Sequence, residues 1–198
     1  MKGKTIFFDV DTQYDFIDRK GKLYVKGAQE IVKNLKLLTD FARVNGILII
    51  ASVDRHLKND PEFKFFPAHC ITGTKGMKKI RQTLLGGAIT ISQREYKHNV
   101  LSKILKKAKQ IIIEKNTYDA FLNPNLKILL RGVKNAYVYG VATDYCVKSV
   151  ALGLRNLGIR TYLLTDAIRA KNSLSGNEAL KLLRKSGVKG VSIKGIRS

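Results

Sequence analysis

Short apolar runs alternate along the chain with segments in which apolar residues recur every three or four positions. The runs are rich in Ile, Val and Phe, which is typical of buried strands. We expect strands at residues 5–10, 47–53, 88–92, 110–113, 136–141 and 159–164, with 188–193 as a final strand or an edge.

The segments between these runs have helical periodicity. Apolar residues from Ala28 to Ala42 lie on one helical face, and Gly46 follows as a stop signal. We expect further helices at residues 100–109 and from about Asp144 to a stop at Gly158. Ser175 and Glu178 form a capping-box pattern for the last helix, which should turn Ala179, Leu182 and Leu183 inward.

This alternation predicts an α/β fold with three layers, α/β/α, around a mostly parallel sheet of about six strands. We expect residues 1–198 to form a single domain. In such Rossmann-like sheets, binding sites lie at the carboxyl ends of the strands, where the strand order reverses. The irregular segment from residue 54 to 76 is rich in His, Pro, Asp and Gly, as expected of a functional loop.

Composition indicates the cellular compartment of the protein but does not identify its chemistry. Hydrophobic residues make up 44% of the chain, and no apolar run approaches the ~18 residues that span a bilayer. The N-terminal segment has no signal-peptide pattern. The two cysteines, Cys70 and Cys146, do not form a disulfide framework, so we expect a reduced, cytoplasmic protein.

The net charge is +22, from 37 basic and 15 acidic residues. Such a surface attracts nucleic acid, anionic lipid or an acidic partner. The basic residues are dispersed over the outer faces of the expected helices, which favours a solvated surface with non-specific nucleic-acid affinity at most. No aromatic-rich strand motif or paired Cys/His finger indicates a dedicated nucleic-acid binder.

Three residues with catalytic potential follow three different strands. Cys146 begins a helix directly after a strand, where the helix N-terminus should ease ionisation of its thiol. Asp11 and Lys115 stand at the carboxyl ends of two other strands. Alternatively, Asp11 is a solvated loop residue or a helix cap, and Asp9 competes for its role, although strand alternation would send Asp9 into the sheet or the helix layer.

Asp54, His56 and His69 are candidate metal ligands. Asp54 and His56 point to the same side of an extended chain, and two of the three histidines lie in this region, whereas His98 has a surface context. Two His and a carboxylate are a common ligand set for Zn²⁺, Fe²⁺ or Mn²⁺. The alternative is a set of loop residues that hydrogen-bond to one another.

Taken together, these segments resemble the isochorismatase-like cysteine hydrolases, and within them the nicotinamidase (pyrazinamidase) group. Asp11-x-Gln13-x-Asp15-Phe16 matches the motif of the catalytic acid/base. Lys115 with Tyr118-Asp119-Ala120-Phe121 matches the segment of the catalytic lysine. The run from Gly140 to Val147 matches the nucleophile motif, and the resemblance extends from Asp11 to about Asp166.

The resemblance implies roles for particular residues. It implies a catalytic triad of Asp11, Lys115 and Cys146, a cis peptide before Ala142, and an oxyanion hole made by the N–H groups of Ala142 and Cys146. Asp54-x-His56 and Pro67-x-His69-Cys70 resemble the metal segments of the nicotinamidase group, with zinc preferred over iron or manganese. The residues implied to bind the substrate are Phe16, Phe66, Val141 and Tyr145, with the two phenylalanines on either side of a pyridine ring.

Two positions depart from the nicotinamidase pattern. Phe66 stands where Trp is usual, and Arg55 stands where an aromatic residue is usual. Glu62, in the same loop, is a further candidate ligand or base. We therefore expect hydrolysis of nicotinamide to nicotinate and ammonia, with a homo-oligomer possible; the alternatives are a family hydrolase for another amide, ureide or vinyl ether, and a basic nucleic-acid-binding protein on this scaffold.

Overall fold

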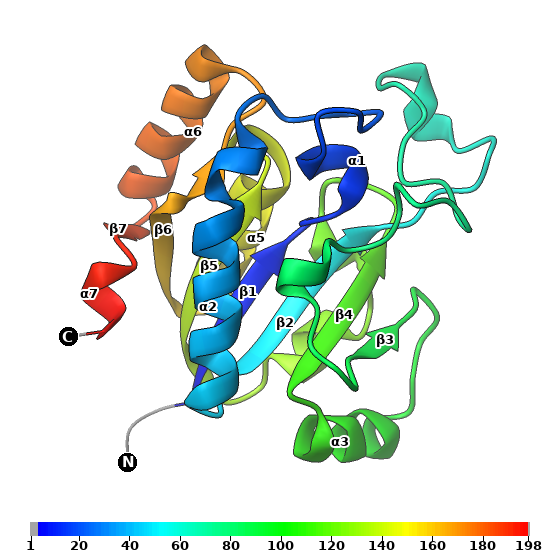
Figure 1. The fold of residues 1–198 in the computed structure, drawn as a ribbon. Coiled ribbons are helices and arrows are strands. Elements are labelled where there is room, and N and C mark those ends of the chain that lie inside the picture. The colour runs from blue at the N-terminus through cyan, green and yellow to red at the C-terminus, as the bar shows by residue number, and fades with distance from the viewer. Residues whose placement is uncertain (1–3, 198) are drawn as a thin grey trace.

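The computed structural model describes residues 4–197. Seven parallel strands form one sheet in the order β3-β4-β2-β1-β5-β6-β7 (Figure 1). This confirms the expected parallel sheet, with one strand more than the six anticipated. The strands are β1 (Lys4–Val10), β2 (Leu48–Asp54), β3 (Ile89–Ile91), β4 (Gln110–Lys115), β5 (Val133–Val141), β6 (Arg160–Arg169) and β7 (Lys189–Val191).

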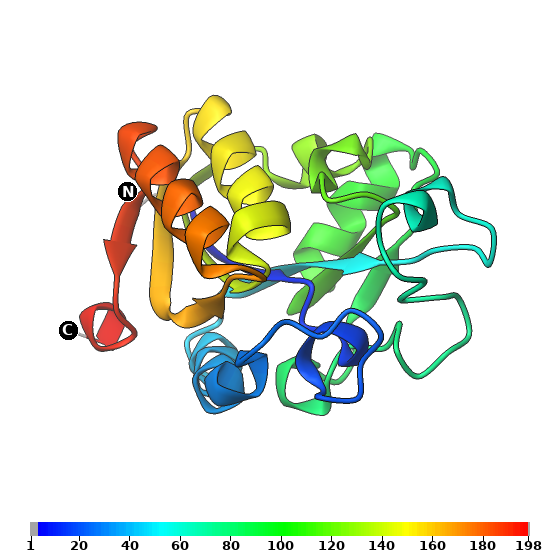
Figure 2. The same ribbon diagram turned by 90° about the horizontal axis from the view of Figure 1, so that it is seen from above.

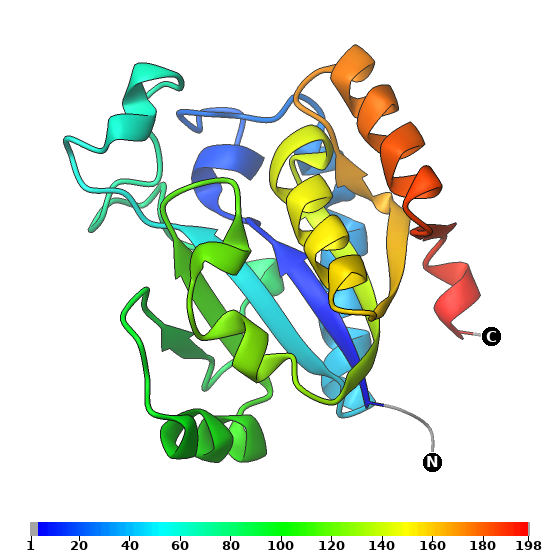
Figure 3. The same ribbon diagram turned by 180° about the vertical axis from the view of Figure 1, so that it is seen from behind.

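Helices cover both faces of this sheet, which gives the three layers that the sequence predicts (Figure 2). One face is covered by α1 (Tyr14–Ile17), the short helix η1 (Ala28–Ile31), α2 (Val32–Val44) and α7 (Lys194–Arg197). The other face, seen in Figure 3, is covered by α3 (His98–Lys107), α4 (Leu126–Leu129), α5 (Lys148–Asn156) and α6 (Ser173–Lys185).

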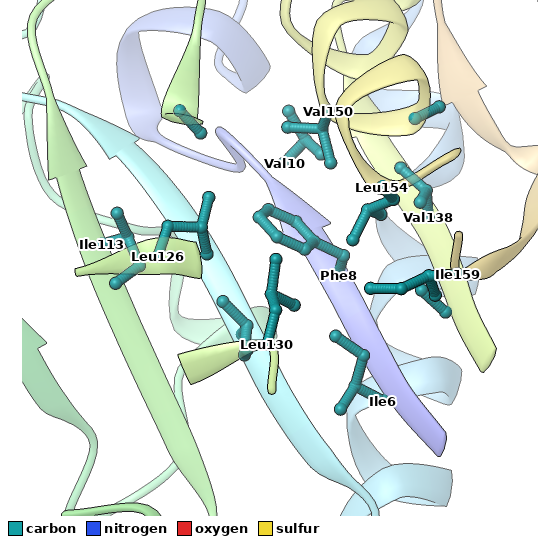
Figure 4. Close-up of a cluster of buried hydrophobic side chains, with 14 of the residues drawn as sticks. Ile6, Phe8, Val10, Ile113, Leu126, Leu130, Val138, Val150, Leu154 and Ile159 are labelled. Carbon is teal, nitrogen blue, oxygen red and sulfur yellow. The ribbon is translucent and has the colours of Figure 1, made fainter. Parts of the chain in front are cut away.

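Strand β1 shows why the apolar runs are continuous rather than alternating. Ile6, Phe8 and Val10 pack toward α5 and α4, as Figure 4 shows, whereas Phe7 packs on the α2 side. All four side chains are fully buried because both faces of the sheet are covered. The burial of this central strand therefore fixes the position of Asp11, which follows its carboxyl end.

The order in which strands are added to the sheet reverses at β1. The strand that follows β1 in sequence, β2, lies on one side of it, and β5 lies on the other. The expected site position is thus the carboxyl end of β1 and its neighbours. Asp11, Asp54, Lys115 and the turn after Val141 all lie at these ends.

Helix α6, expected as the last helix, is followed by α7, and its start also differs from the prediction. The helix begins at Ser173, and the Asn172 side chain caps it by accepting hydrogen bonds from the N–H groups of Leu174 and Ser175. The Ser175 hydroxyl instead donates to Asp144 Oδ2 at 2.6 Å. Leu182 is 46% exposed, so only Ala179 and Leu183 of the three expected residues turn inward.

Two irregular segments flank the carboxyl ends of the strands, namely the turn that carries Cys146, called the nucleophile turn, and the long β2–β3 connection. Residues Thr143–Val147 form a π-helical turn, η5, before α5 begins. The connection contains only the short helices η2 (Pro61–Lys64) and η3 (Arg81–Thr83), and η4 (Ala120–Leu122) follows β4. Among residues 4–197, no helix is long and apolar enough to cross a membrane.

Candidate active site

Asp11, Lys115 and Cys146 meet at the carboxyl edge of the sheet. Lys115 ends β4, and its Nζ lies 2.8 Å from Asp11 Oδ2 and 3.6 Å from Cys146 Sγ. The Lys115 side chain is 1% exposed and also forms an ion pair with Asp54 at the end of β2. The structure therefore brings together the three residues that the sequence placed at separate strand ends.

Asp11 is fixed by its neighbour strand. The Ser52 hydroxyl donates to Asp11 Oδ1 at 2.6 Å, and the Asp11 N–H donates to the Ser52 carbonyl at 3.2 Å. Burial raises the pKa of Asp11, and the Lys115 ammonium opposes that rise. Asp9 does not compete, because it pairs with Lys79 at 2.8 Å within the layer on the α2 side.

Burial opposes the easier ionisation of the Cys146 thiol that its place at the start of a helix suggested. Burial raises the pKa of Cys146 well above its usual value, and Lys115 only partly opposes this. The neighbouring Asp11 and Asp54 carboxylates raise it further. A base is therefore needed to remove the proton, and Asp11 is in place to do so.

The turn before Cys146 depends on Gly140. Its φ is +115°, and a Cβ at this position would lie 2.1 Å from the carbonyl oxygen of Val10. A cis peptide joins Val141 and Ala142, as the resemblance implied. Ala142 and Cys146 both line the pocket at this turn.

Asp54, His56 and His69 form a cluster beside the triad. Asp54 Oδ2 lies 3.5 Å from His69 Nε2 and 3.9 Å from His56 Nε2. Glu62 Oε2 lies 3.9 Å from His56 Nε2 on the loop side. Within residues 4–197, His56 Nε2 and Glu62 Oε2 are buried atoms without a hydrogen-bond partner. Two imidazoles and carboxylate oxygens with unused lone pairs fit a divalent cation.

Several residues that the sequence analysis did not assign hold these donors in place. Gln13 forms two hydrogen bonds with the backbone of Asp54, at 2.8 and 2.7 Å. Asp60 Oδ2 lies 3.1 Å from His56 Nδ1, and the same side chain caps η2, which carries Glu62. An Asp-Pro pair is a helix-start signal, so Asp60 could have been found from the sequence.

Asp11 and Cys146 of the triad line the same pocket as Asp54, Glu62 and His69 of the donor cluster, and its empty volume is about 440 Å³. All four expected substrate-binding residues, Phe16, Phe66, Val141 and Tyr145, line it. Arg55 does not appear among the described residues that line it, because its guanidinium pairs with Glu114 at 2.8 Å. The sequence analysis missed four lining residues, namely Leu23, Val25, Tyr118 and Lys171.

Phe66 has aromatic and cationic neighbours in this pocket. Its ring meets the Tyr145 ring edge-on with centroids 5.7 Å apart. Lys171 Nζ lies 4.9 Å from the Phe66 ring centroid. The backbone N–H of Lys171 donates to Asp144 Oδ1 at 2.9 Å, which ties the β6–α6 loop to the nucleophile turn.

Known proteins share this architecture. The pyrazinamidase of Pyrococcus horikoshii in complex with zinc superimposes with a TM-score of 0.80 at 27% identity, covering 96% of this chain and 99% of that one. The nicotinamidase of Escherichia coli is 26% identical over 82% of each chain. An uncharacterised isochorismatase family protein, PncA of Bacillus subtilis, is 29% identical over 82% of this chain and 85% of the relative.

A ureidoacrylate amidohydrolase, RutB of Agrobacterium fabrum, is also similar, at 25% identity over 79% of this chain and 69% of the relative. The model of the isochorismatase domain matches residues 5–194, almost the whole chain. The chain therefore belongs to the isochorismatase family of hydrolases.

Proposed function

We propose that this protein is a nicotinamidase, with residues 1–198 acting as one hydrolase domain that converts nicotinamide to nicotinate and ammonia. The observation that carries the proposal is a single pocket lined by Asp11 and Cys146, which Lys115 contacts from behind, and by Asp54 and His69 of the donor cluster. The first cluster supplies a nucleophile and a base, and the second favours a substrate with a ring nitrogen. The nicotinamidase and pyrazinamidase relatives support this choice.

In the first half-reaction, Asp11 takes the Cys146 proton as Sγ attacks the carboxamide carbon. The carbonyl electron pair moves onto oxygen, which accepts hydrogen bonds from the N–H groups of Ala142 and Cys146. When the C–N bond breaks, Asp11 gives its proton to the nitrogen, and ammonia leaves. The product of this half-reaction is a thioester on Cys146.

In the second half-reaction, Asp11 takes a proton from water as its oxygen attacks the thioester carbon. The C–S bond then breaks, the proton returns to Cys146, and nicotinate is released. The ammonium of Lys115 compensates the buried carboxylates and stabilises the thiolate while it forms. Burial alone would lower the pKa of Lys115, but Asp11 and Asp54 outweigh it and hold that pKa well above its usual value.

Asp54, His56 and His69 would hold a divalent cation, zinc in the first place and iron or manganese as alternatives, with Glu62 as an additional oxygen donor. Such a cation supplies a Lewis acid for the pyridine nitrogen and so orients the ring. The chain itself encloses the ring, because Phe16 of α1 and Phe66 of the β2–β3 connection both line the pocket. Phe66 offers a smaller stacking face than Trp but the same kind of contact.

A second candidate is a family hydrolase for an amide or ureide that bears a carboxylate. The observation that favours it is Lys171, a cation at the pocket that the nicotinamidase reaction does not use. The name of the Agrobacterium fabrum relative indicates such a substrate for that protein.

A substrate panel separates the two candidates. Ammonia release is measured with nicotinamide, pyrazinamide and ureidoacrylate, with and without prior chelation and zinc replenishment. We expect the highest kcat/KM for nicotinamide, with activity lost on chelation and restored by metal. Turnover of ureidoacrylate alone, without nicotinamide turnover by metal-replete protein, would reject the nicotinamidase proposal in favour of the second candidate.

A further inference from the structure

The sheet has one face region without a covering helix. The connection from β1 to β2 runs across the α2 side and contains α2, whereas residues 55–88, all of them described, connect β2 to β3 without an α-helix. Figure 1 shows β3 and β4 at the edge of the sheet away from α2. Ala51 and Val53 of β2 form a small separate apolar cluster here with Ile112 of β4 and with Ala88, which precedes β3.

This region is a groove with an empty volume of about 1230 Å³, separate from the catalytic pocket. Val53, Ala88 and Ile112 form its apolar floor, and Tyr14 also lines it, with Lys75 Nζ 4.8 Å from the Tyr14 ring centroid. The loop at its wall contributes four basic residues, Lys75, Lys78, Lys79 and Arg81. The groove therefore combines an apolar floor with a cationic wall.

The wall has three cations available for a ligand. Lys79 is buried and already paired with Asp9, but Lys75, Lys78 and Arg81 are exposed. The one acidic residue that lines the groove is Glu114, and Arg55 pairs with it at 2.8 Å. The groove thus has an excess of positive charge.

The remaining surface of the protein also carries an excess of positive charge. Of the fifteen acidic residues, six are buried, whereas only Lys79 and Lys115 are buried among the basic residues that the structure describes. A second copy of this chain would therefore bring mainly positive charge to the groove, and repulsion disfavours it as the occupant. A polyanion is the partner that the charge fits.

We propose that this groove binds single-stranded nucleic acid without sequence preference. Phosphates would pair with Lys75, Lys78 and Arg81, and the faces of unstacked bases would lie on the apolar floor and against Tyr14. A duplex keeps its base faces inside, so the floor favours a single strand. An acidic peptide without aromatic residues, such as polyglutamate, could use the cations but has no planar apolar groups for the floor. The inference does not depend on the proposed catalytic activity.

The test compares two triple variants that remove the same charge. Lys75→Gln/Lys78→Gln/Arg81→Gln changes the groove, and Lys181→Gln/Arg184→Gln/Lys185→Gln changes exposed residues of α6, on the opposite face of the sheet. Binding of a short fluorescein-labelled oligouridylate is followed by anisotropy over a range of salt concentrations. Circular dichroism and thermal unfolding check that both variants fold.

We expect the groove variant to bind at least about tenfold more weakly at about 0.1 M salt, because it lacks three phosphate contacts. Its slope of log K against log salt should fall by about 2, since each contact with a single strand contributes about 0.7. The α6 variant should change little. Equal losses in both variants would show a diffuse field and overturn the proposal, as would tighter binding of polyglutamate or of duplex, or no binding by the wild type.

Discussion

Lys115 Nζ lies 3.6 Å from Cys146 Sγ, so the end of β4 meets the turn that follows β5. These strands are separated in the sheet by β2 and β1, which contribute Asp54 and Asp11 to the same cluster. Lys115 is thus the common partner of two carboxylates and a thiol. The proposed chemistry depends on this one buried ammonium.

Lys115→Met should abolish amide hydrolysis and also destabilise the fold. It leaves Asp11 and Asp54 buried without their cation, and breaking a buried pair costs about 3–5 kcal/mol. Urea unfolding measures the loss of stability. Lys79→Met is the matched control, because it breaks the buried pair with Asp9 outside the catalytic pocket. It should lose stability but keep kcat for the folded fraction; loss of kcat in both variants alike would argue against a catalytic role for Lys115.

His56→Ala should lower metal affinity and nicotinamide turnover together, since it removes a nitrogen donor from the centre of the cluster. Glu62→Gln should weaken metal binding to a smaller extent, because Asp54 and both imidazoles remain. Competition with a zinc-binding dye measures both affinities. His98→Ala, at an exposed site, is the control and should bind metal like the wild type. Unchanged affinity in His56→Ala would contradict the assignment of the donors.

Phe66→Ala should raise KM for nicotinamide by roughly tenfold or more, with a smaller effect on kcat. It removes an aromatic face from the pocket, and burying such a side chain against a ligand is worth about 1.5–3 kcal/mol. The neighbouring Phe65 is 82% exposed, so Phe65→Ala serves as the control. Steady-state kinetics of the two variants should therefore differ. Similar KM values would place the substrate ring elsewhere.

Gly76→Ala should destabilise the loop that carries His69. A Cβ at Gly76 would lie 2.1 Å from the Asp15 carboxylate, which accepts the Cys70 N–H at 2.7 Å. Moving the Asp15 carboxylate away from the added methyl group should lower the free energy of unfolding by about 1–3 kcal/mol. Gly86→Ala meets nothing within 4 Å and is the control. Equal stability of both variants would show that Asp15 can move at little cost.

Periodicity was sufficient to predict most elements of the fold. The apolar runs identified the strands because both faces of the sheet are buried, and Ile6, Phe7 and Phe8 all count as core. The prediction of the α6 cap was wrong. Ser175 matches a capping box, but Asn172, which is also a preferred N-cap residue, is the one that caps the helix. Local patterns could not decide between them, since Asp144 takes up the Ser175 hydroxyl from another element.

The candidate site was predictable where residues stand at strand ends. Parallel strands bring Asp11, Asp54 and Lys115 to one edge of the sheet, and this does not depend on the conformation of the loops. Leu23, Val25 and Lys171 were missed because they reach the pocket from loops whose paths depend on tertiary packing. The sequence shows that Cys146 follows a strand at the start of a helix, but the burial that raises the pKa of its thiol is not visible in the sequence.

The most direct test of the central claim is ammonia release from nicotinamide by metal-replete wild-type protein and by Cys146→Ala. The account predicts turnover by the wild type and none by the variant, with nicotinamide binding retained. Full activity of Cys146→Ala would contradict it and make Cys70, the other cysteine, the residue to examine.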